Sequence, residues 1–322
     1  MERTAKKRII TAFAVLSVLA LGAVILFTAW GLTENNIGYN LPRRLVKVAA
    51  ISLTGCAIAV SSLVFQTITN NRILTPSVMG LDSLFLFMQS LVAFVLGADT
   101  LIMTGKYLDF ALSTMLMTGF SLMLCIVVFR KTGQNIFLLV LVGMICGSFF
   151  SSLSSFMQTL IDPNEYTILQ GKMFASFNNV NTSLLAISAI LIGLSLLFML
   201  NTHKKLDVMS LGRENSINLG IFYDRAVIIY LLLISLMVAV STALVGPITF
   251  LGIMVVNVSR QIFKTYRHLY LALGACLLSI LTLVGGQFLV ERVFHFNTTV
   301  SVLANFAGGI YFIALLLKER RV

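Results

Sequence analysis

Long runs of apolar residues, separated by short polar segments, occupy most of the chain. Ten such runs lie near residues 9–30, 45–68, 80–97, 110–129, 136–160, 183–201, 226–245, 247–262, 269–290 and 299–317. A helix needs about 20 consecutive apolar residues to cross the hydrocarbon core of a bilayer. The pattern therefore predicts an all-α polytopic membrane protein with about ten transmembrane helices, in a single domain that covers residues 1–322.

Two of the runs are shorter than the others. The run at 247–262 follows directly on Gly246 and Pro247, a pair that ends or bends a helix. We expect a broken or re-entrant element there. The run at 80–97 has Asp82 at its start, and this is the one acidic residue whose place inside or outside the membrane the pattern leaves open.

The distribution of charge predicts an orientation. The chain carries 23 Lys and Arg against 12 Asp and Glu, a formal net charge of +11 that would also suit a protein binding nucleic acid. The basic residues, however, lie between the apolar runs, and 17 of the 23 fall on one side when the runs are threaded through a membrane from a cytoplasmic N-terminus. Cytoplasmic loops carry such an excess. We therefore expect a multi-pass plasma-membrane protein with both termini in the cytoplasm, surrounded by lipid and without a nucleic-acid partner.

Two connecting segments are long enough to contain structure of their own. On the outer side, residues 161–180 hold a cluster of turn-forming and acidic residues followed by an amphipathic stretch. This predicts an extracytoplasmic loop with a short interfacial helix. On the inner side, residues 203–225 form the longest cytoplasmic segment.

Motifs for independent enzyme chemistry are absent from the sequence. GxxxxGK[ST], HExxH and GxSxG do not occur, so the chain has no phosphate-binding loop for ATP and none of these catalytic signatures. His203, His268 and His295 lie far apart at predicted membrane boundaries, where snorkelling to the interface explains them, and no metal site is predicted. An ion-coupled secondary transporter, the alternative from another class, would need ionisable residues deep in its spans. Almost all of them here lie at span ends.

Four segments carry a resemblance to a known family. They are Leu41-Pro42-Arg43 with Asn70, Asn71 and Pro76 to Gly80; Leu211-Gly212 with Leu219-Gly220; Gly246 to Gly252 with Arg260; and Glu291-Arg292 with Gly308 and Gly309. In order and spacing they resemble the FecCD-type permeases of ABC importers for iron-siderophore complexes and vitamin B12. The chain departs from that pattern at Asn40, Asn257 and residues 294–299. These departures are similar to the branch that imports catecholate siderophores such as petrobactin.

The resemblance implies the type II ABC importer permease fold and a non-enzymatic transport subunit. Members of the family pair two permease chains, bind two ATP-binding subunits on the inside and receive a loaded substrate-binding protein outside. The chain itself would bind no cofactor and no metal, while the partner ATPase would use ATP and Mg²⁺. The implied cargo is a ferric siderophore of the catecholate or petrobactin type, with vitamin B12 or haem as the alternative within the family. The departures favour a heterodimer over a homodimer.

The resemblance also assigns three groups of candidate site residues. Segment 203–225 matches the cytoplasmic loop that couples to the ATPase, with Leu211, Gly212, Arg213, Glu214, Asn215, Ser216, Leu219 and Gly220. Arg43 and Arg292 match positions that receive acidic residues of the binding protein, and Arg44 and Lys47 add charge nearby. The candidate docking residues are thus Arg43, Arg44 and Arg292. Gly246, Pro247 and Gly252 form the candidate broken helix or gate. Small residues in 51–66 and 143–155 would either line the path or let helices pack closely.

Overall fold

The computed structural model describes residues 2–32, 36–97, 105–132 and 136–319, and every regular element within these ranges is a helix. The helices are α1 (Glu2–Ala29), α2 (Ile37–Ile68), the 3₁₀ helix η1 (Pro76–Met79), α3 (Leu81–Leu96), α5 (Lys106–Thr132), α6 (Ile136–Leu160), α7 (Pro163–Met173), α8 (Thr182–Asn201), α9 (His203–Met209), α10 (Arg213–Asn218), α11 (Tyr223–Val245), α12 (Leu251–Phe263), α13 (His268–Arg292) and α14 (Val300–Glu319). Each of the ten predicted runs coincides with one helix, which confirms the predicted fold class.

Seven of the described helices are long and apolar enough to cross a membrane: α1, α2, α5, α6, α8, α11 and α13. The other three apolar runs form shorter helices. The helix α3 has 16 residues and α12 has 13, and α14 is apolar between Val300 and Leu315. The helix α12 is short because the chain from Gly246 to Phe250 is not helical, so a five-residue non-helical segment separates α11 from α12.

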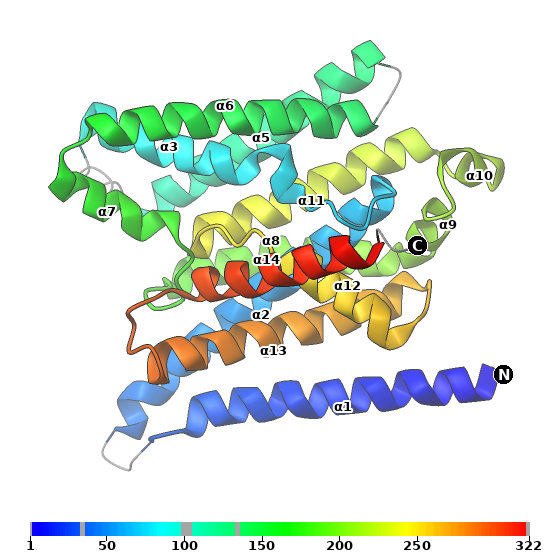
Figure 1. Ribbon diagram of the computed structural model, residues 1–322, viewed down its shortest axis with the longest axis horizontal. Coiled ribbons are helices and arrows are strands. Elements are labelled where there is room, and N and C mark those ends of the chain that lie inside the picture. Colours follow the sequence, from blue (N-terminus) through cyan, green and yellow to red (C-terminus); the bar gives the residue numbers. More distant parts are fainter. Residues whose placement is uncertain (1, 33–35, 98–104, 133–135, 320–322) are drawn as a thin grey trace.

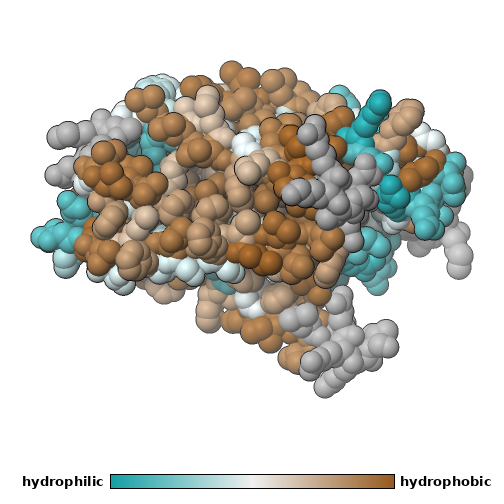
Figure 2. Space-filling model, turned by 90° about the horizontal axis from the view of Figure 1, so that it is seen from above, coloured by the Kyte–Doolittle hydropathy of each residue, from teal (hydrophilic) through white to brown (hydrophobic). Residues whose placement is uncertain are grey.

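The long helices lie side by side in one bundle (Figure 1). The helices α2 and α11 pack against each other at its centre and are the most buried of the seven, whereas α3, α5 and α6 lie together on one side. On the opposite side, α1 packs on α12 and α13 and leaves most of its apolar surface exposed. Figure 2 shows hydrophobic residues over the middle of the molecule and hydrophilic residues toward its two ends. Such a surface fits the hydrocarbon core of a bilayer.

The two ends of the bundle carry different segments. The start of α1, the end of α14 and the short helices α9 and α10 lie at one end, while α7, the end of α1 and the start of α2 lie at the other (Figure 1). The first and last described helices therefore begin and end at the same end of the bundle, as the predicted orientation requires, and α9 and α10 lie at that end too. The outer segment contains the helix α7, whose first turn is capped by the Asp162 carboxylate accepting from the main-chain nitrogen of Asn164 at 2.8 Å.

Small residues in α6 serve close packing. Gly80, which follows η1, has φ of +80°, a conformation that glycine adopts without strain. A Cβ atom there would lie 2.9 Å from the Cα atom of Gly147, and a Cβ atom on Gly143 would lie 2.8 Å from the Cα atom of Met79. Of the two roles that the sequence left open for residues 143–155, packing therefore applies to Gly143 and Gly147.

Candidate functional site

Segment 203–225 contains two short helices, α9 and α10, and a glycine of positive φ lies on each side of α10. Gly212 precedes α10 with φ of +93°, and Gly220 follows it with φ of +84°. Only glycine adopts these angles without steric cost. The two glycines therefore let the chain reverse at both ends of a six-residue helix, so that α10 projects from the bundle beyond α9 (Figure 1).

The residues of α10 divide into an exposed face and an anchor. Arg213, Glu214 and Asn215 are exposed, as the candidate coupling role requires. Ser216 is fully buried, and its hydroxyl lies 2.6 Å from the carbonyl oxygen of Gly212 and 3.1 Å from that of Val208. The interpretation of Ser216 as part of the polar docking surface is therefore wrong, because its side chain joins α10 to α9 instead of facing a partner.

Apolar side chains cover the outside of this segment. Leu211, Ile217, Leu219 and Phe222 are 56%, 44%, 62% and 77% exposed, and we call these four residues the coupling patch. An exposed apolar patch rimmed by polar residues marks a surface that binds another protein or a membrane. The two leucines are among the predicted coupling residues, but Ile217 and Phe222 are not. The signal for both was a large apolar side chain within a short polar loop.

A buried histidine fastens α9 to the bundle. His268 is the first residue of α13 and is 4% exposed. Its ring Nδ1 donates to the Asp207 carboxylate at 2.7 Å, and its Nε2 lies 2.8 Å from the Thr67 hydroxyl of α2. Snorkelling is therefore the wrong explanation for His268. The three side chains instead connect the cytoplasmic segment, α13 and α2.

Asp207 is held as a carboxylate by this arrangement. Partial burial acts to raise the pKa of Asp207, but hydrogen bonds from the ring and the main-chain nitrogen of His268 outweigh it, so the pKa lies below its ordinary value. The main-chain nitrogen of His268 donates to the same oxygen at 2.6 Å. Asp207 thus satisfies an N-terminal amide of α13 as well as the imidazole.

On the outer side, Arg44 closes the end of a helix. Its Nη1 lies 2.9 Å from the carbonyl oxygen of Thr28, 2.7 Å from that of Trp30 and 3.4 Å from that of Phe27. The last carbonyl groups of a helix have no partner within the helix, and a cation there is stabilising. Arg44 therefore caps α1, and its guanidinium is engaged inside the protein instead of being free for a docking partner.

The other outer cations differ in the exposure and the pairing of their charged groups. Arg292 donates to the same Trp30 carbonyl oxygen at 3.1 Å and is exposed. Lys47 binds the Glu291 carboxylate at 2.7 Å, so its charge is neutralised. Arg43 is exposed and its guanidinium carbon lies 4.1 Å from the ring centroid of Tyr39. Of the predicted set, the structure brings Arg44 and Arg292 together, and it leaves Arg43 and Arg292 accessible.

The segment between α11 and α12 is held against the outer loop. Gly246 has φ of +102°, and a Cβ atom there would lie 2.9 Å from the Cα atom of Ala175. The main-chain nitrogen of Ser176 donates to the carbonyl oxygen of Val245 at 2.8 Å. The buried Pro247 follows, so the break occurs at the predicted residues and contacts the chain that leaves α7.

Two residues of α12 fasten it to the end of α2. A Cβ atom on Gly252 would lie 2.0 Å from the hydroxyl oxygen of Ser62, so only glycine allows this approach. One turn and a half later, Asn257 Nδ2 donates to the carbonyl oxygens of Arg72 and Ile253, both at 3.0 Å. Asn257, one of the departures from the family pattern, therefore holds the segment that follows α2.

A cavity of about 570 Å³ lies beside this break. Its walls come from η1, α3, α6, α12, α14 and the segment after α7, and they are mostly apolar with hydroxyl and amide groups between. Asp82 lines it, with Oδ1 3.5 Å from the Thr242 hydroxyl and Oδ2 without a hydrogen-bond partner. Among the residues that the structure describes, no group of three or more His, Cys, Asp or Glu side chains could hold a metal ion.

Comparisons with known proteins agree with this geometry. Residues 9–318 match the model of the FecCD transport family. The chain is 54% identical over 308 residues to the petrobactin import system permease protein YclO of Bacillus subtilis (strain 168), covering 96% of this chain and 97% of that one. It is 33% identical over 278 residues to the petrobactin import system permease protein FatC of Bacillus anthracis, covering 86% and 78%.

A solved structure shows the same fold. An inward-facing metal-chelate-type ABC transporter superposes with a TM-score of 0.83 at 20% identity, over 96% of this chain and 99% of that one. The chain thus has the type II ABC importer permease fold. The chain belongs to the FecCD transport family and is a multi-pass plasma-membrane protein.

Proposed function

We propose that this chain is one of two permease subunits of an ATP-driven importer that carries a ferric siderophore of the petrobactin type into the cytoplasm. The observation that carries the proposal is the 54% identity to the petrobactin permease YclO over almost the full length of both chains.

The coupling patch supports a soluble partner on the cytoplasmic side. Four exposed apolar side chains lie at the end of the bundle, one on α10 and the other three just before or after this short helix. The polar contacts of Asp207 and Ser216 make this helix a firm extension of α9 and α13. We propose that ATP-binding subunits dock on the patch, so that their movement is transmitted through His268 to α2 and α13.

The cavity beside Gly246 supports one half of a translocation path. It is formed by the break, by the chain leaving α7 and by α14, and its lining offers few charged groups. A lining that binds weakly lets a bulky ferric complex pass without being trapped. We propose that a second permease completes the path by facing the same elements.

The relatives support a heterodimer. Two permease proteins of a petrobactin import system, FatC and FatD of Bacillus anthracis, are 33% and 26% identical to this chain. Bacillus anthracis thus has two distinct permease proteins of a petrobactin import system, and the sequence of this chain is more similar to that of FatC. Purification of the importer through a tag on this chain alone should yield two permease species by mass spectrometry, and a single species would contradict the heterodimer.

Growth on one iron source tests the proposed cargo. Cells that lack this chain should fail to grow when ferric petrobactin is the only iron source, and the restored gene should recover growth. Haem as the only iron source serves as the comparison. Unchanged growth on petrobactin, with lost growth on haem, would reject the petrobactin assignment while leaving the family intact.

A further inference from the structure

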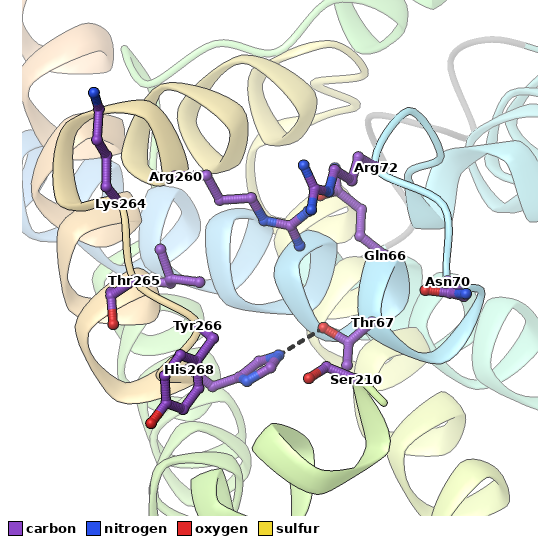
Figure 3. A pocket seen from close by; sticks show the side chains of 11 residues that line it. Gln66, Thr67, Asn70, Arg72, Ser210, Arg260, Lys264, Thr265, Tyr266 and His268 are labelled. Atoms are coloured by element: carbon purple, nitrogen blue, oxygen red, sulfur yellow. Dashed lines mark hydrogen bonds between the residues drawn. The ribbon is translucent and has the colours of Figure 1, made fainter. Parts of the chain in front are cut away.

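A second pocket opens at the cytoplasmic end of the bundle (Figure 3). Its volume is about 410 Å³, and it is bounded by the end of α2, the segment that follows, the turn between α12 and α13, and the end of α9. This pocket is separate from the cavity beside Gly246. We call it the basic pocket because of the residues that line it.

Three basic residues line the basic pocket, and two of them, Arg72 and Arg260, direct their charged groups into it, whereas the Lys264 ammonium points away (Figure 3). The guanidinium groups of Arg72 and Arg260 lie next to each other (Figure 3). Among the residues that the structure describes, no carboxylate forms an ion pair with any of these three. The carboxylate that contacts the lining residue His268 is Asp207, which is already engaged by that histidine. Two guanidinium groups at close range repel each other unless an anion lies between them.

An unsatisfied amide lies beside the two guanidinium groups. Gln66 is 2% exposed, and neither Nε2 nor Oε1 has a hydrogen-bond partner. Figure 3 shows its side chain reaching toward Arg72 and Arg260. A buried amide without a partner is costly, so Nε2 needs an acceptor that the protein does not supply. The same acceptor can serve both guanidinium groups.

The walls of the basic pocket are fixed before any ligand arrives. Asn257 donates to the main-chain carbonyl of Arg72 at 3.0 Å, and the Ser259 hydroxyl donates to that of Leu271 at 3.0 Å. The Thr67 hydroxyl contacts His268 across the back of the pocket. Because these hydrogen bonds hold the segments that carry the charges in place, ligand binding does not include the entropic cost of ordering them.

We propose that the basic pocket binds a phosphate group supplied by the headgroup of an anionic phospholipid. The two non-bridging oxygens of a phosphodiester can accept hydrogen bonds from both planar guanidinium forks and from the Gln66 amide, and its negative charge offsets the repulsion between the two arginines. The pocket lies at the cytoplasmic boundary of the bundle, where basic pockets between helices bind anionic headgroups. Tyr266 at its rim is 72% exposed, and this residue type is enriched at the membrane interface.

Lipid binding to the purified full-length chain tests the proposal. Native mass spectrometry would titrate phosphatidylglycerol, phosphatidylcholine and inorganic phosphate against the wild type and the double variant Arg72→Gln/Arg260→Gln. Arg267→Gln is the matched control, because Arg267 is an exposed cation on the same turn that does not line the pocket. We expect phosphatidylglycerol to be preferred by the wild type, and its Kd to rise about 30-fold in the double variant and to stay unchanged in the control.

Other outcomes would overturn the proposal. Equal Kd values for phosphatidylglycerol in the wild type and the double variant would place the lipid elsewhere. Arg72-dependent binding of inorganic phosphate without preference for phosphatidylglycerol would reject the lipid as the source. Loss of the ATPase subunit from the complex, with lipid binding unchanged, would assign the pocket to an acidic partner residue. The single variant Arg260→Lys keeps the charge but loses the fork, and its expected intermediate Kd separates binding from misfolding.

Discussion

The carboxylate of Asp207 in α9 accepts two hydrogen bonds from His268, the first residue of α13, at 2.6 Å from its main-chain nitrogen and 2.7 Å from its ring Nδ1. The two residues are 61 positions apart in the chain. They connect the cytoplasmic segment that carries the coupling patch to a helix that packs along α2. This pair therefore links the coupling patch to the bundle by a polar contact, in addition to the chain connections to α8 and α11.

Replacing Asp207 by Asn should loosen that link. The substitution keeps the shape of the side chain but removes the charged acceptor of two hydrogen bonds, and we expect a loss of about 2 kcal/mol of stability. Thermal unfolding of the purified chain measures this. Glu214→Gln, which removes an exposed carboxylate from the same segment, is the control and should leave the melting temperature unchanged. Equal melting temperatures for both variants would contradict the role of Asp207.

The same pair predicts a dependence on pH. Because the pKa of Asp207 is lowered in the folded protein, its contribution to stability is complete above the ordinary aspartate pKa of about 3.9 and is lost as the pH falls through the lowered value. The difference in melting temperature between the wild type and Asp207→Asn should therefore be constant from about pH 7 to pH 5 and shrink below about pH 4. A difference that persists at the lowest pH would show that the charge is not its source.

The coupling patch predicts a large effect from one added charge. Leu219→Asp places a carboxylate in the centre of the proposed contact with the ATPase, and we expect the Kd of that subunit to rise about 30-fold, typical of an interface hot spot. Surface plasmon resonance on the detergent-solubilised permease measures it. Asn218→Asp adds the same charge to the neighbouring exposed position and should change the Kd far less. A similar loss of affinity in both variants would mean that the added charge, and not the apolar coupling patch, determines binding of the ATP-binding subunit.

The two neighbouring outer arginines should have separable effects. Arg44→Gln removes the cap of α1 and should lower the stability of the chain by about 1 kcal/mol. Arg43→Glu should leave stability unchanged and slow the association of the binding protein, more so at low salt than at high salt. Melting curves and association rates at two ionic strengths test both. If Arg44→Gln alone slowed association, the docking role would belong to Arg44 after all.

Gly252 provides a test of the packing between α12 and α2. An added Cβ atom would lie 2.0 Å from Ser62 Oγ and 2.8 Å from Ser62 Cβ, so Gly252→Ala should cost about 1–3 kcal/mol through overpacking. Ser62→Gly should restore the loss, because it removes both clashing atoms. Gly309→Ala in α14 is the control, since a Cβ atom there meets nothing within 4 Å. Failure of Ser62→Gly to restore stability would reject this contact as the cause.

The helices could be predicted from the sequence because hydropathy is a local property. Runs of about 20 apolar residues and the position of Lys and Arg gave all ten helices and the common side of the start of α1 and the end of α14. Gly246 and Pro247 marked the break for the same reason, since backbone conformation at glycine and proline follows from the residue itself.

The roles of single side chains could not be predicted, because they depend on contacts between distant segments. Ser216 and Asn215 are adjacent and both polar, yet one is buried and one exposed. Arg44 caps α1 from α2, and Lys47 pairs with a glutamate 244 positions away. No pattern within the runs distinguishes these residues from free surface charges.

ATP-dependent transport by a reconstituted importer tests the central claim most directly. Proteoliposomes would contain this chain, its partner permease and the ATP-binding subunits, with the binding protein added to the compartment that faces the outer end. We predict that ATP drives accumulation of radiolabelled ferric petrobactin on the side of α9 and α10, and that Leu219→Asp abolishes it while Asn218→Asp does not. Accumulation without ATP, or none with the complete wild-type complex, would contradict the account.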